Sequence, residues 1–503
     1  MGSRPHRLPD SRNGVEHRAI APGAADPLAA GPAGAQFLRG GATRVFAYVG
    51  GITTSIVALP FVTRHLHRAD YGRYVVVTSL IVIVALITEG GIANLGVREF
   101  SGAPGPERRE FMRNLIGMRI SLSALGGAGA IVFALLAGYP RAVVEGTVIA
   151  AFGLVLAGVQ VTLTVPLTAA LRLQWLAALD FLVPAVTAST LVVLVVLGAP
   201  LLPFFGAAVL AYATSLVITA SLVHREVTLR PAFSPARWRE LLRDSAVFAA
   251  ATAFGVVYFQ VVVVAMSLIS TPGQTGVFSL AFRILSVVNG IPVLLVGSAF
   301  PILLRAASDD RERLRYASAR LLEGNLLFGG WLSLLVVAGA PFAIHVIGGP
   351  GFAGSATVLR ILGAGVIATF VAALFAMTLL SLRAYRLLIF TSLGMVVLAV
   401  ALCALLIPAH GARGAAVVTL TLEVVLACTY GTMLALRNPE LRPALGRSGR
   451  ICAALAVGFA AALLVPVSSV PAALIGTAAL AVSALALHAV PVELFAALRP
   501  GAR

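Results

Sequence analysis

The chain has 503 residues, of which 59% are hydrophobic and only 11% are charged. This composition excludes a soluble globular domain and indicates a protein embedded in a membrane. The net charge is +17, and because the sequence contains no lysine, all 37 basic residues are arginines. A phosphate-binding loop that needs its lysine and a Schiff-base site are therefore both excluded.

Residues 1–40 are rich in Arg, Pro, Gly and Ala and lack the apolar stretch of a signal peptide, so we expect a disordered basic cytoplasmic tail. From residue 41 onward, apolar runs alternate with short loops. About fourteen runs reach the roughly 20 residues needed to cross a bilayer. They lie approximately at 41–61, 71–93, 114–137, 142–169, 176–197, 200–223, 244–269, 275–304, 321–347, 354–380, 387–407, 413–436, 451–466 and 471–490. The predicted fold class is an all-α polytopic membrane protein.

The arginines predict the orientation of these spans. If the first segment is cytoplasmic, the segments on its side of the membrane hold 28 arginines, whereas the opposite loops hold only Arg64, Arg68 and Arg141. Such an asymmetry places both termini in the cytoplasm, and for a bacterial protein this means the inner membrane. The arginines are dispersed and no aromatic residues interleave with them, so we expect contact with membrane lipids and no nucleic-acid binding.

Three short sequence matches indicate an internal repeat. They recur at offsets of 204 to 211 residues and pair 72–74 with 276–278, 171–172 with 382–383, and 206–209 with 414–417. The matches predict two parallel six-helix lobes, a plan in which transporters hold their substrate between the lobes. We expect an N-lobe at 41–223, a cytoplasmic linker at 224–243 and a C-lobe at 244–436. Residues 437–503 would form spans 13 and 14, two extra C-terminal helices, and a short tail. The extra pair is either a lipid-facing appendage or a surface for a lipid tail.

Charged residues inside the spans are the first candidates for a functional site. Arg283 lies about eight residues into span 8, and Glu423 lies about ten residues into span 12. Either they pair with each other or with Glu89, or Arg283 binds a phosphate while Glu423 takes up a proton or a cation. Arg44 and Arg73 lie closer to span ends, where snorkelling is the simpler interpretation.

Three uncharged polar residues lie at similar depth: Gln160, Gln260 and Asn289. They either line the same cavity or form hydrogen bonds between helices. The three cysteines lie inside apolar runs without a C-x-x-C pair, and no metal-binding or nucleophilic motif is apparent, so we expect no metal, no cofactor and no catalytic residue. The coupling of transport to protons or sodium stays open.

Several collinear motifs resemble those of bacterial polysaccharide flippases of the multidrug/oligosaccharidyl-lipid/polysaccharide exporter superfamily. Residues 58–74, ALPFVTRHLHRADYGRY, are similar to the family's end of span 1 and start of span 2. Residues 276–301 resemble its span 8, with an Ala-Phe-Arg-Ile step that contains Arg283 and a closing Phe-Pro. Residues 348–362 and 410–417 resemble its spans 10 and 12. Residues 65–69 depart from the family, which usually shows Leu-Gly-Pro there.

The resemblance implies two six-helix lobes around a cationic cavity that moves an undecaprenyl-diphosphate-linked oligosaccharide to the outer leaflet by alternating access. It makes Arg283 the best-supported cavity residue and Arg44 and Arg73 weaker ones. It also implies that other polysaccharide-assembly proteins are partners. One alternative is a cation-coupled multidrug antiporter of the same superfamily. Another is a membrane glycosyltransferase or polymerase, against which the short outer loops argue.

Overall fold

The computed structural model describes residues 32–89, 91–102, 104–309, 311–441, 445–465 and 468–489, and every regular element in these ranges is helical. The first half of the chain contains α1 (Pro32–Glu89), α2 (Ile92–Gly102), α3 (Gly105–Leu136), α4 (Arg141–Leu163), α5 (Val165–Ala169), α6 (Leu173–Val196), α7 (Leu201–Phe204) and α8 (Gly206–Val223). The second half contains α9 (Pro235–Ile269), α10 (Pro272–Val288), α11 (Gly290–Asp309), α12 (Arg311–Gly348), η1 (Pro350–Phe352), α13 (Ser355–Ala364), α14 (Val366–Ser381), α15 (Tyr385–Arg437), η2 (Pro439–Leu441), α16 (Leu445–Leu464) and α17 (Ser469–Ala486).

Within the described residues, 11 helices are long and apolar enough to cross a membrane. Two of them are pairs of spans that meet at a kink, α1 at His67 and α15 at Gly411. Each kinked helix counts as two spans, and α9 adds one more, with Val257–Ile269 as its described apolar part. The total is about fourteen spans, as the sequence predicts. The all-α polytopic fold class is confirmed.

Several helices extend beyond the predicted boundaries. Helix α1 begins at Pro32, inside the expected tail, and α9 begins at Pro235, inside the expected linker. These two predicted boundaries are wrong, because hydropathy detects only the apolar part of a helix, whereas each helix begins several residues earlier. Residues 1–31 and 490–503, which include most of the predicted tail and the C-terminal end, lie outside the described residues.

The internal repeat is visible in the backbone. Three turns of the first half have a residue with positive φ, and each has a counterpart in the second half. The pairs are Gly138 (φ 69) with Gly349 (φ 67), Leu171 (φ 53) with Arg383 (φ 58), and Gly198 (φ 65) with Gly411 (φ 54). Their offsets of 211, 212 and 213 residues follow directly from the numbering. Because most residues avoid this region of φ, three matched turns support a repeat of spans 1–6 over spans 7–12.

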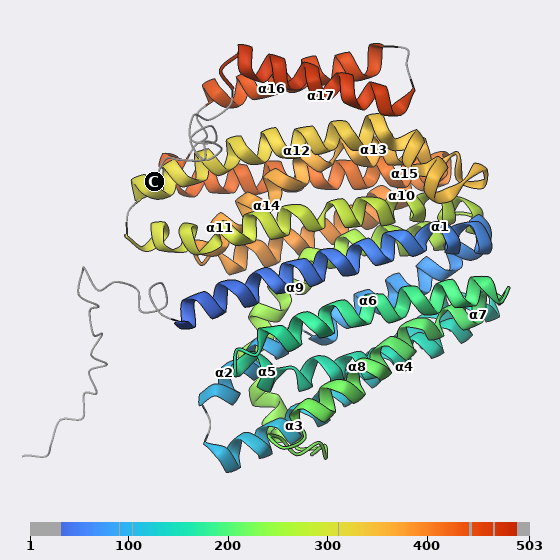
Figure 1. The fold of residues 1–503 in the computed structure, drawn as a ribbon, viewed down its shortest axis with the longest axis vertical. Helices are drawn as coiled ribbons and strands as arrows, with labels where there is room; N and C mark the ends of the chain where they lie inside the picture. The colour runs from blue at the N-terminus through green and yellow to red at the C-terminus, as the bar shows by residue number, and fades with distance from the viewer. Residues whose placement is uncertain are drawn as a thin grey trace, which may run out of the picture.

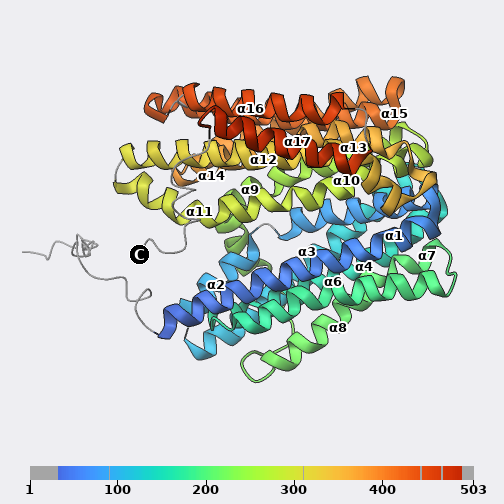
Figure 2. The same cartoon turned by 45° about the horizontal axis from the view of Figure 1, so that its top comes forward.

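The helices lie side by side in two groups (Figures 1 and 2). Helices α3, α4, α6 and α8 form one group, α12 to α15 form the other, and α1, α9 and α10 lie between them. We keep the names N-lobe and C-lobe for the two groups, with α1 in the N-lobe and α9 and α10 in the C-lobe. The exact residue limits of the lobes stay a prediction. The hairpin of α16 and α17 packs on α12 at the far side of the C-lobe.

The bundle has two ends, which we name by their residues. The arginine end is where α1 begins, and there Arg172 pairs with Glu226, Arg237 with Glu110, and Arg311 with Glu440. The hinge end is the opposite end, where α1 bends at His67 (φ 56, ψ 175). Both ends of the hairpin's described chain, at 445 and 489, return to the arginine end.

Candidate functional site: a cavity between the lobes

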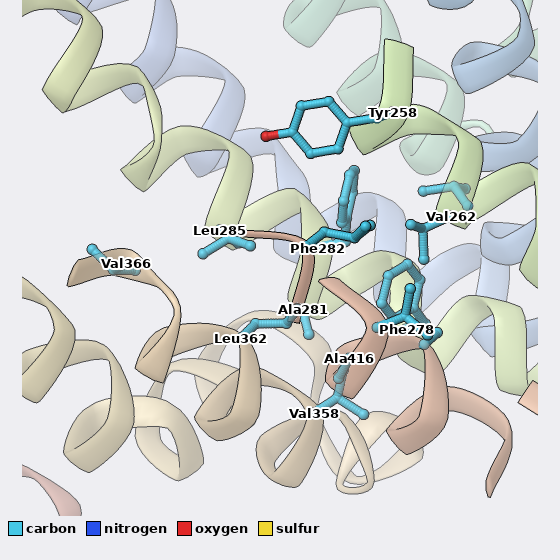
Figure 3. Close-up of a cluster of buried hydrophobic side chains, with 14 of the residues drawn as sticks. Tyr258, Val262, Phe278, Ala281, Phe282, Leu285, Val358, Leu362, Val366 and Ala416 are labelled. Atoms are coloured by element: carbon cyan, nitrogen blue, oxygen red, sulfur yellow. The ribbon is translucent and has the colours of Figure 1, made fainter. Parts of the chain in front are cut away.

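Helix α10 has one face in the core of the C-lobe and one face toward the N-lobe. Its core face carries Phe278, Ala281, Phe282 and Leu285, which are all buried. Figure 3 shows these side chains packed among residues of α9, α13, α14 and α15, with Leu362 beside Ala281. Because this face is held in the core, the residues on the other side of the helix are directed at the N-lobe.

That other face carries Ser279, Arg283 and Ser286, which are four and three residues apart and therefore lie in one row along the helix. The row lines a cavity of about 180 Å³ between α1, α6, α9 and α10. The polar residues that share this cavity are Ser55, Tyr71, Tyr74, Thr78, Ser79, Thr187 and Gln260. Arg283 is thus the charged residue of a lining that is otherwise hydroxyl-rich and apolar.

A second cavity of about 250 Å³ adjoins the first and shares Ser55, Arg283 and Ser286 with it. Its remaining lining includes Tyr48 and Asp180, which lie closer to the arginine end of α1 and α6. The two cavities therefore form a path that leads from the middle of the bundle toward the arginine end.

The guanidinium of Arg283 forms no ion pair or hydrogen bond with any residue that the structure describes. Arg283 is exposed, whereas two polar atoms of the same cavity lining, Gln260 Oε1 and Ser279 Oγ, are buried and have no hydrogen-bond partner. A charged group inside a membrane protein is costly unless it meets a partner or water. An unpaired guanidinium beside neutral donors is suited to a phosphate-type anion, which it can bind through two parallel hydrogen bonds.

The hinge end of the path is closed by direct contacts between the lobes. Thr63 Oγ1 donates to Ile347 O at 2.7 Å, and Tyr71 lies edge-on to Phe352 with ring centroids 5.8 Å apart. The backbones meet closely at Gly276, where a Cβ would overlap the carbonyl oxygen of Arg68. Only glycine permits this approach. Together, these contacts close the central cavity at the hinge end.

The other two predicted cavity arginines are both engaged elsewhere. Arg44 pairs with Asp180 at 2.7 Å, joining α1 to α6 where the second cavity ends. Arg73 pairs with Asp70 at 2.7 Å and lines neither cavity. Among the three predicted arginines, the structure therefore brings only Arg283 into the central cavity without a partner.

Glu423 lies in a separate cavity of about 280 Å³ inside the C-lobe. Its carboxylate accepts a hydrogen bond of 2.9 Å from the hydroxyl of Tyr258, and Thr369, Ser392 and Tyr430 line the same cavity. The alternative in which Arg283 pairs with Glu423 is therefore not what the structure has, because Glu423 faces the interior of its own lobe.

Glu89 lies 3.9 Å from the guanidinium of Arg119 and not beside Arg283. Arg119 is only 4% exposed and donates to Thr88 O at 2.6 Å. Glu89 thus belongs to a packing contact within the N-lobe, and it lines neither cavity.

The three uncharged candidates fall in different places. Gln260 lines the cavity, as described above. Gln160 is buried between α4 and α8, where its amide lies 3.5 Å from the hydroxyl of Thr219. Asn289 ends α10, and its buried Oδ1 has no partner, but it lines neither cavity.

The tyrosines and serines of the cavity were not among the residues predicted from the sequence. A signal was present for some of them, because Tyr71 and Tyr74 lie in the Asp-Tyr-Gly-x-Tyr motif and Ser279 and Ser286 share the row of Arg283. Across the described residues, no group of three His, Cys, Asp or Glu side chains is arranged to hold a metal ion.

A bundle of two repeated lobes with a polar cavity between them is the architecture of membrane transporters that work by alternating access. Solved structures with this fold include "Lipid II flippase MurJ, inward closed conformation", with a TM-score of 0.71, 11% identity, and coverage of 91% of this chain and 100% of that chain. An inward-facing multidrug resistance MATE family transporter of the MOP superfamily matches with a TM-score of 0.63 and 15% identity, over 78% of this chain and 95% of that chain. A point mutant of the Vibrio cholerae MATE transporter VcmN matches with a TM-score of 0.52 and 12% identity, over 81% of this chain and 98% of that chain.

The family model described as "Polysaccharide biosynthesis protein" matches residues 38–307, which is more than half of the chain. The chain belongs to this family. With 11 helices long and apolar enough to cross a membrane among its described residues, it is a multi-pass membrane protein. No curated protein matches the chain in sequence.

Proposed function

We propose that the protein is a flippase that moves an undecaprenyl-diphosphate-linked oligosaccharide from the cytoplasmic to the outer leaflet for cell-surface polysaccharide synthesis. The observation that carries the proposal is the unpaired guanidinium of Arg283 in a cavity that leads toward the arginine end. A diphosphate is the charged part of such a substrate, and its sugars would meet the hydroxyl groups of the lining. The isoprenoid tail stays in the lipid beside the bundle.

In this proposal the arginine end faces the cytoplasm, as the distribution of arginines predicts, and the protein lies in the bacterial inner membrane. The cavity then opens toward the side on which the lipid-linked sugar is made. Rocking of the lobes closes the arginine end and opens the hinge end. Reporter fusions at residues 138 and 445 test the orientation, since the first should report the outer side and the second the cytoplasm.

The test of the site is Arg283→Ala. Hydrogen bonds to a charged group contribute roughly 1.5–3 kcal/mol each, so we expect export to fall by about tenfold to a hundredfold. Export is measured as surface polysaccharide in cells that depend on this protein, with its membrane amount determined by blotting. Arg283→Lys should restore part of the activity, because ammonium keeps the charge but loses the two-pronged geometry.

Arg360→Ala is the matched control, because Arg360 is an exposed arginine of α13 that lines neither cavity. It should export like the wild type. Wild-type export by Arg283→Ala at equal protein amount would contradict the proposed site.

We further propose that flipping is coupled to protons or sodium through Glu423, and that other polysaccharide-assembly proteins receive the flipped substrate. The support for coupling is the carboxylate of Glu423 in a C-lobe cavity that is separate from the substrate cavity.

Multidrug antiport is the competing function, because MATE transporters share the fold. Drug resistance in cells that overproduce the protein, without a defect in polysaccharide export on deletion, would favour antiport.

A further inference from the structure

The hinge end has a pocket of its own, on the opposite end of the bundle from the path described above. It has a volume of about 740 Å³ and lies between the bend of α1 and the loop that follows α12. The α1 side contributes Thr63, Arg64, His67 and Arg68, and the α12 side contributes His345 and residues 348–352. It shares no residue with the cavities that Arg283 lines.

The ionisable side chains that line this hinge-end pocket are all basic. Two guanidiniums and two imidazoles line it, and no acidic residue does. The acid that is closest in sequence, Asp70, is already paired with Arg73 at 2.7 Å. Arg68 forms no ion pair with any described residue. Arg64 uses one of its five N–H groups to donate a hydrogen bond to Val346 O at 2.7 Å. The guanidiniums of Arg64 and Arg68 therefore both keep N–H groups that can bind an anion.

The position of these arginines is itself unusual. The predicted loops of the hinge end hold three arginines, whereas the segments of the arginine end hold 28. Arginine is disfavoured on the outer side of a bacterial membrane protein. Because two of the three arginines, Arg64 and Arg68, line the same pocket, we look for a local function that explains their position. The third, Arg141, is exposed and pairs with Glu145 at 2.6 Å on α4, away from the pocket.

The pocket depends on the contact between the lobes. Arg64 lies against α12, where a Cβ on Gly349 would be 3.8 Å from its Nε. Arg68 lies along the start of α10, where a Cβ on Gly273 would be 3.7 Å from its Nε. Opening the hinge end separates α1 from α10 and α12, and the pocket then loses one of its walls.

We propose that the hinge-end pocket binds a phosphate-type anion, and that the bound anion holds the hinge end closed. The anion is either a free diphosphate or the phosphate of a lipid headgroup, since both present the oxygens that guanidinium binds. A ligand that binds only the closed arrangement shifts the population toward it by its binding free energy. Anions on this side of the membrane therefore slow the opening of the hinge end.

The binding test uses the full chain with Arg283→Ala, which removes the cation of the central cavity and separates this site from the proposed function. Inorganic pyrophosphate is titrated calorimetrically into this protein in nanodiscs of uncharged lipid. Phosphatidylglycerol binding is measured by native mass spectrometry on the same protein. Each measurement is repeated with Arg68→Gln and with Arg141→Gln as the matched control.

We expect Arg68→Gln to weaken the binding of one of the two ligands at least tenfold and Arg141→Gln to leave it unchanged. Loss of pyrophosphate binding identifies the free anion as the source, and loss of phosphatidylglycerol binding identifies the headgroup. The proposal is overturned if neither ligand distinguishes Arg68→Gln from Arg141→Gln.

The second measurement tests the link to conformation. Spin labels on Leu197→Cys and Ala353→Cys, which lie at the hinge ends of the two lobes, report the distance across them in a protein whose three native cysteines are replaced. The ligand identified above should increase the fraction of short distances, and this response should disappear in Arg64→Gln and Arg68→Gln. An unchanged distance distribution at saturating ligand would refute the closure part.

Discussion

Arg283 and Glu423 are charged residues at similar depth in the predicted spans, yet their surroundings differ. Arg283 faces the space between the lobes without a partner, whereas Glu423 accepts a hydrogen bond from Tyr258 inside one lobe. Their depth could be predicted from the apolar runs alone. Their partners could not, because Tyr258 is 165 residues away from Glu423 in the chain.

A substitution of Glu423 separates packing from coupling. Glu423→Gln keeps an acceptor for the hydroxyl of Tyr258 but cannot change its charge, so the protein should insert normally and lose the dependence of flipping on an ion gradient. The measurement is flipping in proteoliposomes with and without a pH or sodium gradient. Glu145→Gln, in an exposed ion pair, is the control. A variant that still responds to the gradient like the wild type would exclude Glu423 as the coupling group.

His67 is a non-glycine residue with positive φ, at φ 56 and ψ 175 in the bend of α1. This region suits glycine and costs other residues roughly 1 kcal/mol or more. His67→Gly should therefore raise the thermal unfolding temperature, although the greater freedom of glycine in the unfolded chain offsets part of the gain. His65→Gly should lower it, because His65 has negative φ, contacts Ala199 O and stacks on Phe204. Equal effects of the two variants would contradict this interpretation.

At the scale of helices, buried and exposed ion pairs must be distinguished. Glu323 of α12 has a side chain that is only 7% exposed, and it accepts from Arg320 at 2.7 Å and from Arg447 of α16 at 3.4 Å. This contact ties the hairpin of α16 and α17 to the C-lobe at the arginine end. Hydropathy does not reveal this contact, because Arg447 lies 124 residues away from Glu323 in the chain.

Glu323→Ala should therefore cost roughly 2–3 kcal/mol of stability, since it removes a buried carboxylate that accepts hydrogen bonds from two arginines. Glu145→Ala, which breaks an exposed pair, should cost well under about 1 kcal/mol. Thermal unfolding in detergent measures both. A similar small shift for the two variants would show that the hairpin does not depend on this contact.

At the scale of the whole molecule, the proposed flippase activity requires that the hinge end close and reopen. Gly276→Val places a Cβ against Arg68 O, where there is no room for it. The variant should fold with its hinge end held apart and should lose export. Labelling of Thr63→Cys by a water-soluble thiol reagent should rise in the Gly276→Val background. Gly273→Ala is the control, because its Cβ meets only the side chain of Arg68 at an ordinary 3.7 Å. Normal export by Gly276→Val would contradict a closing role for this contact.

The sequence by itself determined the class of fold, the number of spans and the depth of Arg283, because the bilayer imposes a length on each helix, and its short matches predicted the repeat. It did not determine which charges meet. Arg44 with Asp180, Glu423 with Tyr258, and the two arginines of the hinge-end pocket are brought together only by helix packing. A hydropathy pattern records how deep each residue lies, but only the tertiary structure sets the direction that each helix face takes.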